Sequence, residues 1–274
     1  MLLAASLLFL AGATRAAPVV KRAIHDDPRD SIVARVLASF TAHARPAQSW
    51  YVDLLGGRHP NTREFSGFST QLQSATFVSF TYEFTVNGQR HRRVYHARSG
   101  RNDLVTGLPD ARNPRPYQSY FPHHGSDTIA WAATPPRGSA VTSSPVQGDR
   151  YQDARKRDAE LKVARAIERD IRDGRVVAGG NLYGYSSQEP CPSCEGALQA
   201  LSDQHGIPVH VAYLDRGSPA YRRFDRQRHQ HLTSIEVAVN GGQLNLLNQV
   251  AERPSEQLAV DCIDGPGDGE VDEP

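Results

Sequence analysis

The dipeptide Asn87-Gly88 separates two stretches that each have the pattern of a β-strand. Residues 75–86 read ATFVSFTYEFTV, in which apolar and polar side chains alternate and β-branched and aromatic residues are frequent. A period of two is typical of a strand with one buried face. Asn-Gly is the strongest short signal for a tight hairpin turn, and residues 90–97 return as a second strand. We therefore expect an antiparallel strand pair here.

Helices and strands are also predicted on both sides of this hairpin. Apolar residues recur at helical spacing, behind capping residues or an early proline, over residues 31–40, 159–173 and 192–205. Short stretches rich in β-forming residues predict strands over residues 180–187, 208–214 and 234–239. Together these elements predict an α/β protein, in which helices cover a mixed sheet of five strands.

The connection to the last predicted strand bears on its direction. Residues 215–233 are basic and aromatic, with little sign of a long amphipathic helix. A parallel neighbour would need such a crossover helix, so we expect the final strand, residues 234–239, to be antiparallel.

The chain begins with the apolar run MLLAASLLFLAGA, and the small residues Ala16 and Ala17 follow it. The length and position of the run are typical of a secretory signal peptide, and the run is too short to span a membrane. A buried helix or a misplaced start codon would also explain it. Because the dibasic pair Lys21-Arg22 resembles a processing site, we expect residues 1–22 to be a signal peptide and pro-segment. The mature protein is then secreted, with no membrane attachment.

Three regions are expected after this leader. Residues 23–74 form an N-terminal helical region, residues 75–250 a catalytic domain, and residues 251–274 an acidic, disordered tail. The domain carries a long insertion at residues 98–148, which is rich in Pro, Gly, Ser and Asn and holds several aromatic residues. Such an insertion is either a binding loop or a segment packed by its own aromatics.

Charge is distributed unevenly along the chain. The net charge is +1, but the residues from Asp261 onward hold six acids and no base, which leaves about +7 on the rest. Lys and Arg concentrate in residues 90–101, 155–175 and 216–228. A polyanionic substrate would favour this pattern, although solvated helix faces explain any single cluster equally well.

Two of the three cysteines lie in the tetrad Cys191-Pro192-Ser193-Cys194, which leaves Cys262 without a nearby partner. The pair suits three roles: a redox disulfide, half of a structural zinc site, or two ligands of a catalytic metal. The tetrad is similar to the active sites of glutaredoxin-type proteins, but a hairpin and two helices precede it here. A structural site would need two more ligands, and His205 and His210 follow without a regular ligand spacing. A catalytic site needs one further ligand and a carboxylate.

Asp158-Ala159-Glu160, at the start of the preceding helix, meets this last requirement. With Pro190-Cys191-Pro192-Ser193-Cys194 it resembles the signature of the zinc-dependent nucleoside and nucleic-acid deaminase superfamily, His-x-Glu followed by Pro-Cys-x-x-Cys. The resemblance covers residues 75–239 and is strongest to the secreted deaminases of bacterial polymorphic toxin systems. It implies the cytidine deaminase-like fold, a three-layer α/β/α sandwich.

The resemblance also implies a role for each motif residue. Asp158, Cys191 and Cys194 would bind zinc, and Glu160 would be the catalytic proton shuttle. The family usually has His where this chain has Asp158. As alternatives, Asp158 is a helix N-cap and Glu160 an ordinary first-turn glutamate.

The expected reaction is the hydrolytic deamination of cytosine to uracil in nucleic acid or a nucleotide, with adenine as a second candidate base. If the protein is a secreted toxin, an immunity protein would be its partner. Two other functions stay open: a thiol-disulfide oxidoreductase that uses Cys191 and Cys194, and a non-enzymatic, zinc-stabilised module that binds nucleic acid.

Overall fold

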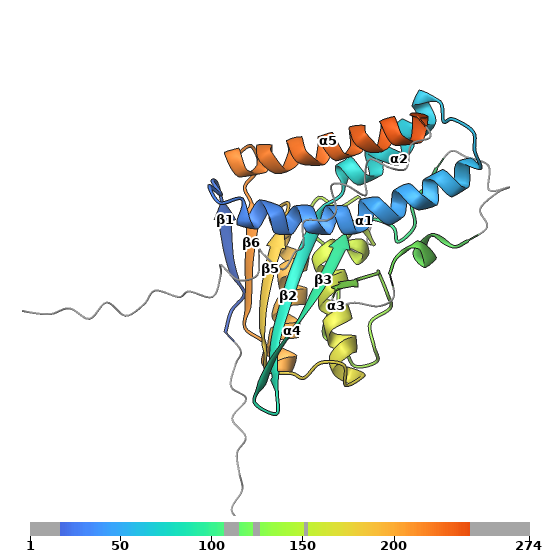
Figure 1. The fold of residues 1–274 in the computed structure, drawn as a ribbon. Coiled ribbons are helices and arrows are strands. Elements are labelled where there is room, and N and C mark those ends of the chain that lie inside the picture. Colours follow the sequence, from blue (N-terminus) through green and yellow to red (C-terminus); the bar gives the residue numbers. More distant parts are fainter. Residues whose placement is uncertain (1–16, 107–114, 123–126, 151–152, 242–274) are drawn as a thin grey trace, which may run out of the picture.

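The computed structural model describes residues 17–106, 115–122, 127–150 and 153–241. A six-stranded mixed sheet lies at its centre, with the strand order β1-β6-β5-β2-β3-β4 (Figure 1). The strands are β1 (Val20–Ile24), β2 (Phe77–Val86), β3 (Gln89–Arg98), β4 (Asp127–Ile129), β5 (Asn181–Ser186) and β6 (Val209–Leu214). The α-helices are α1 (Ser31–Leu55), α2 (Thr62–Ser74), α3 (Ala159–Arg172), α4 (Pro192–His205) and α5 (Pro219–Gly241).

The predicted hairpin is confirmed. β2 pairs with β3 in antiparallel register from Phe77↔Arg98 to Val86↔Gln89, and Asn87 and Gly88 form the turn. Both turn residues have positive φ, 52° and 77°, which Asn and Gly adopt most readily. β2 also pairs antiparallel with β5, and β5, β6 and β1 are parallel to one another. α4 supplies the crossover between β5 and β6, as parallel pairing requires.

Helices lie on both faces of the sheet, which confirms the predicted fold class. α3 and α4 cover one face, where Phe80, Tyr82 and Leu182 join their apolar sides in one core cluster. α1 crosses the other face and, with α2 and α5, forms a second cluster that includes Phe40 and Phe77 (Figure 1). Because side chains alternate along β2, one strand contributes to both clusters.

The sheet has six strands rather than the expected five, and the prediction of a strand at residues 234–239 is wrong. These residues lie in α5. Their alternating Ile and Val residues suggested a strand, but Leu232, Ile235 and Val239 are buried at helical spacing, while Val237 is 58% exposed. Burial against α1 and α2 overrides the local preference for a strand. The last strand is therefore β6, and it is parallel to both neighbours rather than antiparallel.

β1 and β4 were not predicted. β1 begins inside the segment expected to be a leader, and it pairs in parallel with β6. Lys21 in this strand donates a hydrogen bond to Glu189 Oε1 at 3.0 Å and forms an ion pair with Glu195 on α4. A cut at Lys21-Arg22 would therefore fall within a paired strand. Residues 1–16, the tail at 251–274 and Cys262 lie outside the described residues.

The aromatic residues of the insertion are packed inside the protein. Phe121 contacts Trp131 edge to face, with ring centroids 4.8 Å apart, and Tyr117 contacts Trp50 of α1 in the same way at 5.1 Å. Tyr117 and Phe121 are almost fully buried. These rings pack against the α1 side of the core, so they are not a free surface for stacking on bases. Within the described ranges, no helix has the length and apolarity needed to cross a bilayer.

Candidate active site

The candidate site lies where the N-termini of α3 and α4 meet. Asp158 immediately precedes α3, and Cys191 is the N-cap of α4, with Pro192 as the first helical residue. Proline suits this position because its φ is helical and its missing N–H would have no partner there. The two helices pack against each other on the same face of the sheet. Their N-terminal dipoles therefore both favour negative charge at this point.

Three of the four predicted site residues form one compact group of potential metal ligands. The Cys191 Sγ lies 3.3 Å from Asp158 Oδ2, the Cys194 Sγ lies 3.4 Å from the same oxygen, and the two sulfurs are 3.1 Å apart. All the ligand atoms lie within 4.8 Å of one another. Neither Cys191 nor Cys194 forms a disulfide bond. No other group of three such residues is found in the part of the chain that the structure describes.

Asp158 occupies the N-cap position without acting as a cap. Its backbone is extended, as an N-cap requires, but its side chain accepts no hydrogen bond from the first turn of α3. The carboxylate is directed toward the two sulfurs instead. The Asp158 side chain therefore does not cap α3, which was the alternative role expected from the sequence.

Glu160 is the fourth predicted residue, and it faces the same group. It is only 3% exposed, unlike an ordinary first-turn glutamate on a helix surface. Ser186, at the end of β5, donates a hydrogen bond to Glu160 Oε1 at 3.1 Å, and Cys194 Sγ lies 3.5 Å from Oε2. Burial raises the pKa of the Glu160 carboxyl above its ordinary value. A carboxyl with a raised pKa is suited to accept and return a proton near neutral pH.

The two thiols differ in acidity. Hydrogen bonding from Cys194 lowers the pKa of the Cys191 thiol, because it stabilises the thiolate. The pKa of Cys194 is raised, first by its hydrogen bond to Cys191 and then by burial. Cys191 is therefore the first of the pair to lose its proton, and a bound cation would be needed to favour loss of the second.

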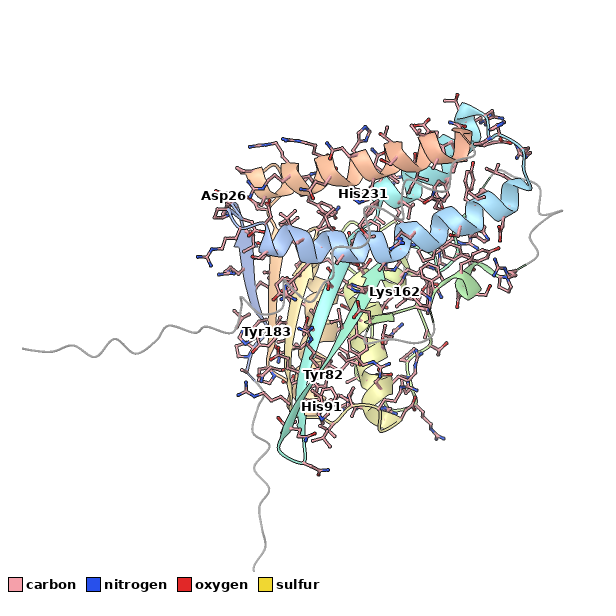
Figure 2. The ribbon with its side chains drawn as sticks, viewed as in Figure 1. Asp26, Tyr82, His91, Lys162, Tyr183 and His231 are labelled. Atoms are coloured by element: carbon pink, nitrogen blue, oxygen red, sulfur yellow. The ribbon has the colours of Figure 1, made fainter. Side chains whose placement is uncertain are left out.

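Sequence patterns did not single out the charged residues around this group. Arg155 donates three hydrogen bonds to Asp149, of which the shortest is 2.6 Å, and its Nη1 lies 3.8 Å from Asp158 Oδ2. The basic stretch 155–157 before the motif was the only available signal. Lys162 lies in the interior one turn into α3 and donates hydrogen bonds to the carbonyls of Arg98 and Gly100 (Figure 2).

The donor set and its spacing suit a zinc ion. Zinc in proteins takes thiolate and carboxylate ligands in tetrahedral geometry, with Zn–S bonds of about 2.3 Å. Two sulfurs in such a site lie about 3.8 Å apart, and a sulfur and an oxygen about 3.5 Å apart. The S···O distances of 3.3 and 3.4 Å agree with this, and the sulfurs at 3.1 Å would need to move apart slightly. Three protein ligands leave the fourth position open, as in catalytic sites.

Comparison with known protein families gives the family of the chain. Residues 67–215 match the model of the Toxin-deaminase family, described as the BURPS668_1122 family of deaminases. The chain belongs to this family. The matched range contains both motifs and all four predicted site residues. No curated protein and no solved structure matches the chain.

Membership of the Toxin-deaminase family confirms the resemblance that the two motifs indicated. It also favours a deaminase over the two alternatives, an oxidoreductase and a non-enzymatic module. The histidines considered for a structural zinc site do not join the candidate site. His210 lies on β6, where it stacks on Tyr183, and His205 lies in the last turn of α4, at the opposite end of that helix from Cys191.

Proposed function

We propose that this deaminase hydrolyses the exocyclic amine of a nucleobase, converting cytosine to uracil in nucleic acid or a nucleotide, with zinc held by Asp158, Cys191 and Cys194. One observation carries the proposal. The buried carboxyl of Glu160 lies beside the three donor groups, at the junction of two helix N-termini, in a chain that belongs to a family of deaminases.

When bound, zinc makes water nucleophilic near neutral pH. The residues of the chain position the reactants and move the protons. In the proposed reaction, water adds to C4 of cytosine, the bond from C4 to the amino nitrogen breaks, and ammonia leaves. Glu160 accepts a proton from the attacking water and delivers it to the ring nitrogen, and it passes the second proton to the departing amine. Ser186 holds Oε1 of Glu160, which leaves Oε2 directed toward the donor groups.

Export and toxicity belong to the same proposal. The apolar run at the start of the chain suits a signal peptide, and the name of the family, Toxin-deaminase, associates it with toxins. We propose that the protein is secreted and acts as a toxin on competing cells. A cell that makes such an enzyme would need an immunity protein to block it.

The test is a substrate screen with the purified protein. Wild type and Glu160→Gln are incubated with nucleosides, nucleotides and oligonucleotides, and the products are scored for ammonia and for C-to-U and A-to-I changes. We expect C-to-U conversion by wild type and a loss of about 10²–10⁴-fold in the variant. Bound zinc, measured by elemental analysis, should be equal in both proteins. Equal deamination by the two proteins would refute the role of Glu160, and A-to-I conversion alone would refute the choice of base.

A further inference from the structure

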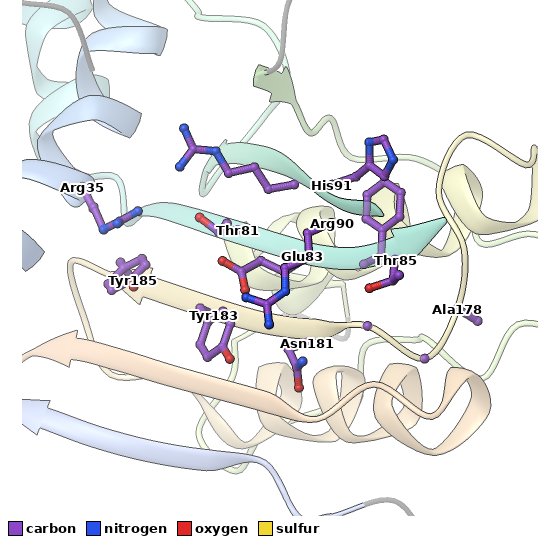
Figure 3. Close-up of a pocket in the computed structure, with 14 residues that line it drawn as sticks. Arg35, Thr81, Glu83, Thr85, Arg90, His91, Ala178, Asn181, Tyr183 and Tyr185 are labelled. Atoms are coloured by element: carbon purple, nitrogen blue, oxygen red, sulfur yellow. The ribbon is translucent and has the colours of Figure 1, made fainter. Parts of the chain in front are cut away.

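A basic groove lies on the sheet face opposite the candidate site. α1 crosses only one end of this face, and the remaining lengths of β2, β3 and β5 extend beyond it (Figure 1). There the structure has a groove of about 850 Å³. Its lining includes Arg35 from α1, Arg90 and Arg92 from β3, and Tyr183 and Tyr185 from β5 (Figure 3). We call this set the basic groove. The proposed mechanism uses none of these residues.

Strand register explains why these side chains share one face. Along β5, Leu182 points into the core beneath α3 and α4, so its neighbour Tyr183 points to the opposite face. Tyr183 is paired with Thr81 of β2, and Arg90 of β3 is paired with Thr85 of the same strand. Residues that pair across strands, or lie two apart along one strand, point to the same side. The sheet therefore presents arginines and tyrosines together.

The groove carries an excess of positive charge. Three guanidinium groups line it, from Arg35, Arg90 and Arg92, and Glu83 is the one carboxylate in the lining. Among the described residues, none of the three arginines forms an ion pair. Arg90 and Arg92 are exposed to solvent. Guanidinium groups that form no ion pair, here two from β3 and one from α1, are suited to bind phosphate oxygens through paired N–H donors.

Flat ring surfaces lie between these charges. Tyr183 stacks on His210 of β6, with ring centroids 5.7 Å apart and an angle of 17° between the planes. The Arg35 guanidinium lies over the Tyr185 ring, 4.8 Å from its centroid. Aromatic and guanidinium planes of this kind stack on unpaired bases whatever their sequence. Bases that are paired in a duplex do not offer their faces in this way.

We propose that the basic groove binds single-stranded nucleic acid, with Arg35, Arg90 and Arg92 at the phosphates and Tyr183 under a base. The proposal deepens the proposed function, on which it rests, by assigning a polymer as the substrate class. Tyr185 and Ser186 are consecutive in β5, but Ser186 faces Glu160 while Tyr185 faces the groove. The two sites therefore lie on opposite faces of the sheet. Only a nucleic-acid chain long enough to pass around the edge of the sheet would occupy the basic groove and the candidate active site together.

The test measures binding directly, so it does not depend on turnover. Glu160→Gln protein is titrated into fluorescently labelled single-stranded DNA or RNA of about 30 nucleotides, and anisotropy is recorded at several salt concentrations. We expect the triple variant Arg35→Gln/Arg90→Gln/Arg92→Gln to bind about ten-fold more weakly or worse, with the slope of log K against log salt reduced by about 2. Tyr183→Ala should weaken binding about ten-fold with little change in that slope.

The control is a second triple variant, which removes the same number of positive charges from the surface outside the basic groove. Arg63, Arg216 and Arg226 are exposed and lie outside the groove, and their triple change to Gln should weaken binding much less. Circular dichroism and thermal melting establish that every variant is folded.

Equal losses of affinity in both triple variants would overturn the proposal, since they would reflect net charge alone. The proposal would also be overturned if polyglutamate displaced the labelled nucleic acid and Tyr183→Ala did not weaken binding. That result would favour an acidic protein partner. A failed substrate screen together with groove-dependent binding would refute the proposed function alone.

Discussion

Arg155 Nη1 lies 3.8 Å from Asp158 Oδ2, and the same guanidinium group is held by three hydrogen bonds to Asp149. Hydrogen bonding to Asp149 raises the pKa of Arg155, so its positive charge is maintained. The position of Asp158 is usually occupied by a neutral histidine in related deaminases. An aspartate there adds one negative charge to a group that already holds two thiols, and Arg155 offsets this charge.

This relationship predicts that the effect of Arg155 on zinc affinity depends on the aspartate at position 158. Arg155→Ala should weaken zinc binding roughly ten-fold, as is common when a group that contacts a ligand is removed. In an Asp158→His background the same change should have little effect or strengthen binding, because Arg155 then has no carboxylate to orient and its positive charge only repels the zinc ion. Equilibrium competition with a chromophoric chelator measures zinc affinity in all four proteins. Equal losses in the two backgrounds would show that Arg155 acts only on the fold.

Cys191→Ser should remove zinc, because the two remaining donors make a poor site. Wild type is expected to contain close to one equivalent of zinc and to melt at a lower temperature when a chelator is added, since bound metal stabilises the native state. The melting temperature of the variant should not respond to chelator. Cys262→Ser is the matched control and should behave as wild type. A variant that retains a full equivalent of zinc would contradict the assignment of Cys191.

Lys162 predicts a pH dependence of stability. Burial lowers the pKa of Lys162 to about 7, from an ordinary value of 10.5. Between these two values the unfolded chain binds one more proton than the native state, so this residue makes stability rise with pH. Relative to Lys162→Met, wild type should gain roughly 3 kcal/mol between about pH 7 and about pH 9.5.

Urea unfolding at a series of pH values measures this difference. Lys156→Met is the control, because Lys156 is exposed and its partner Asp153 is exposed as well. The difference between wild type and this control should be nearly constant across the range. If the stability difference between wild type and Lys162→Met were also constant across this pH range, Lys162 would keep its ordinary pKa in the folded protein.

Two glycine substitutions should change stability in opposite directions. A Cβ at Gly184 of β5 would lie 2.4 Å from the Phe80 ring, so Gly184→Ala should cost about 1–3 kcal/mol through overpacking. Gly67 lies inside α2 with open space around it, and Gly67→Ala should stabilise the protein by about 0.5–1 kcal/mol. Thermal unfolding measures both, and a stabilised Gly184→Ala would mean that β5 is packed less closely than described.

Local sequence pattern was sufficient to predict the β2–β3 hairpin, the helices α3 and α4, and the strands β5 and β6. Each has a clear period, a turn dipeptide or a capping residue, and these depend on neighbours in the chain. The four candidate site residues could also be named in advance, because two short motifs resemble the signature of a deaminase superfamily. Their convergence follows once α3 and α4 pack side by side.

Other features depend on contacts between distant segments. Residues 234–239 form a helix because α1 and α2 bury Ile235 and Val239, and β1 forms a strand because β6 is available beside it. The same holds for the orientation of the Asp158 carboxylate toward the sulfurs of Cys191 and Cys194, and for the basic groove across three strands. In each case the free energy comes from burial or charge contributed by residues far away in sequence, which no local pattern contains.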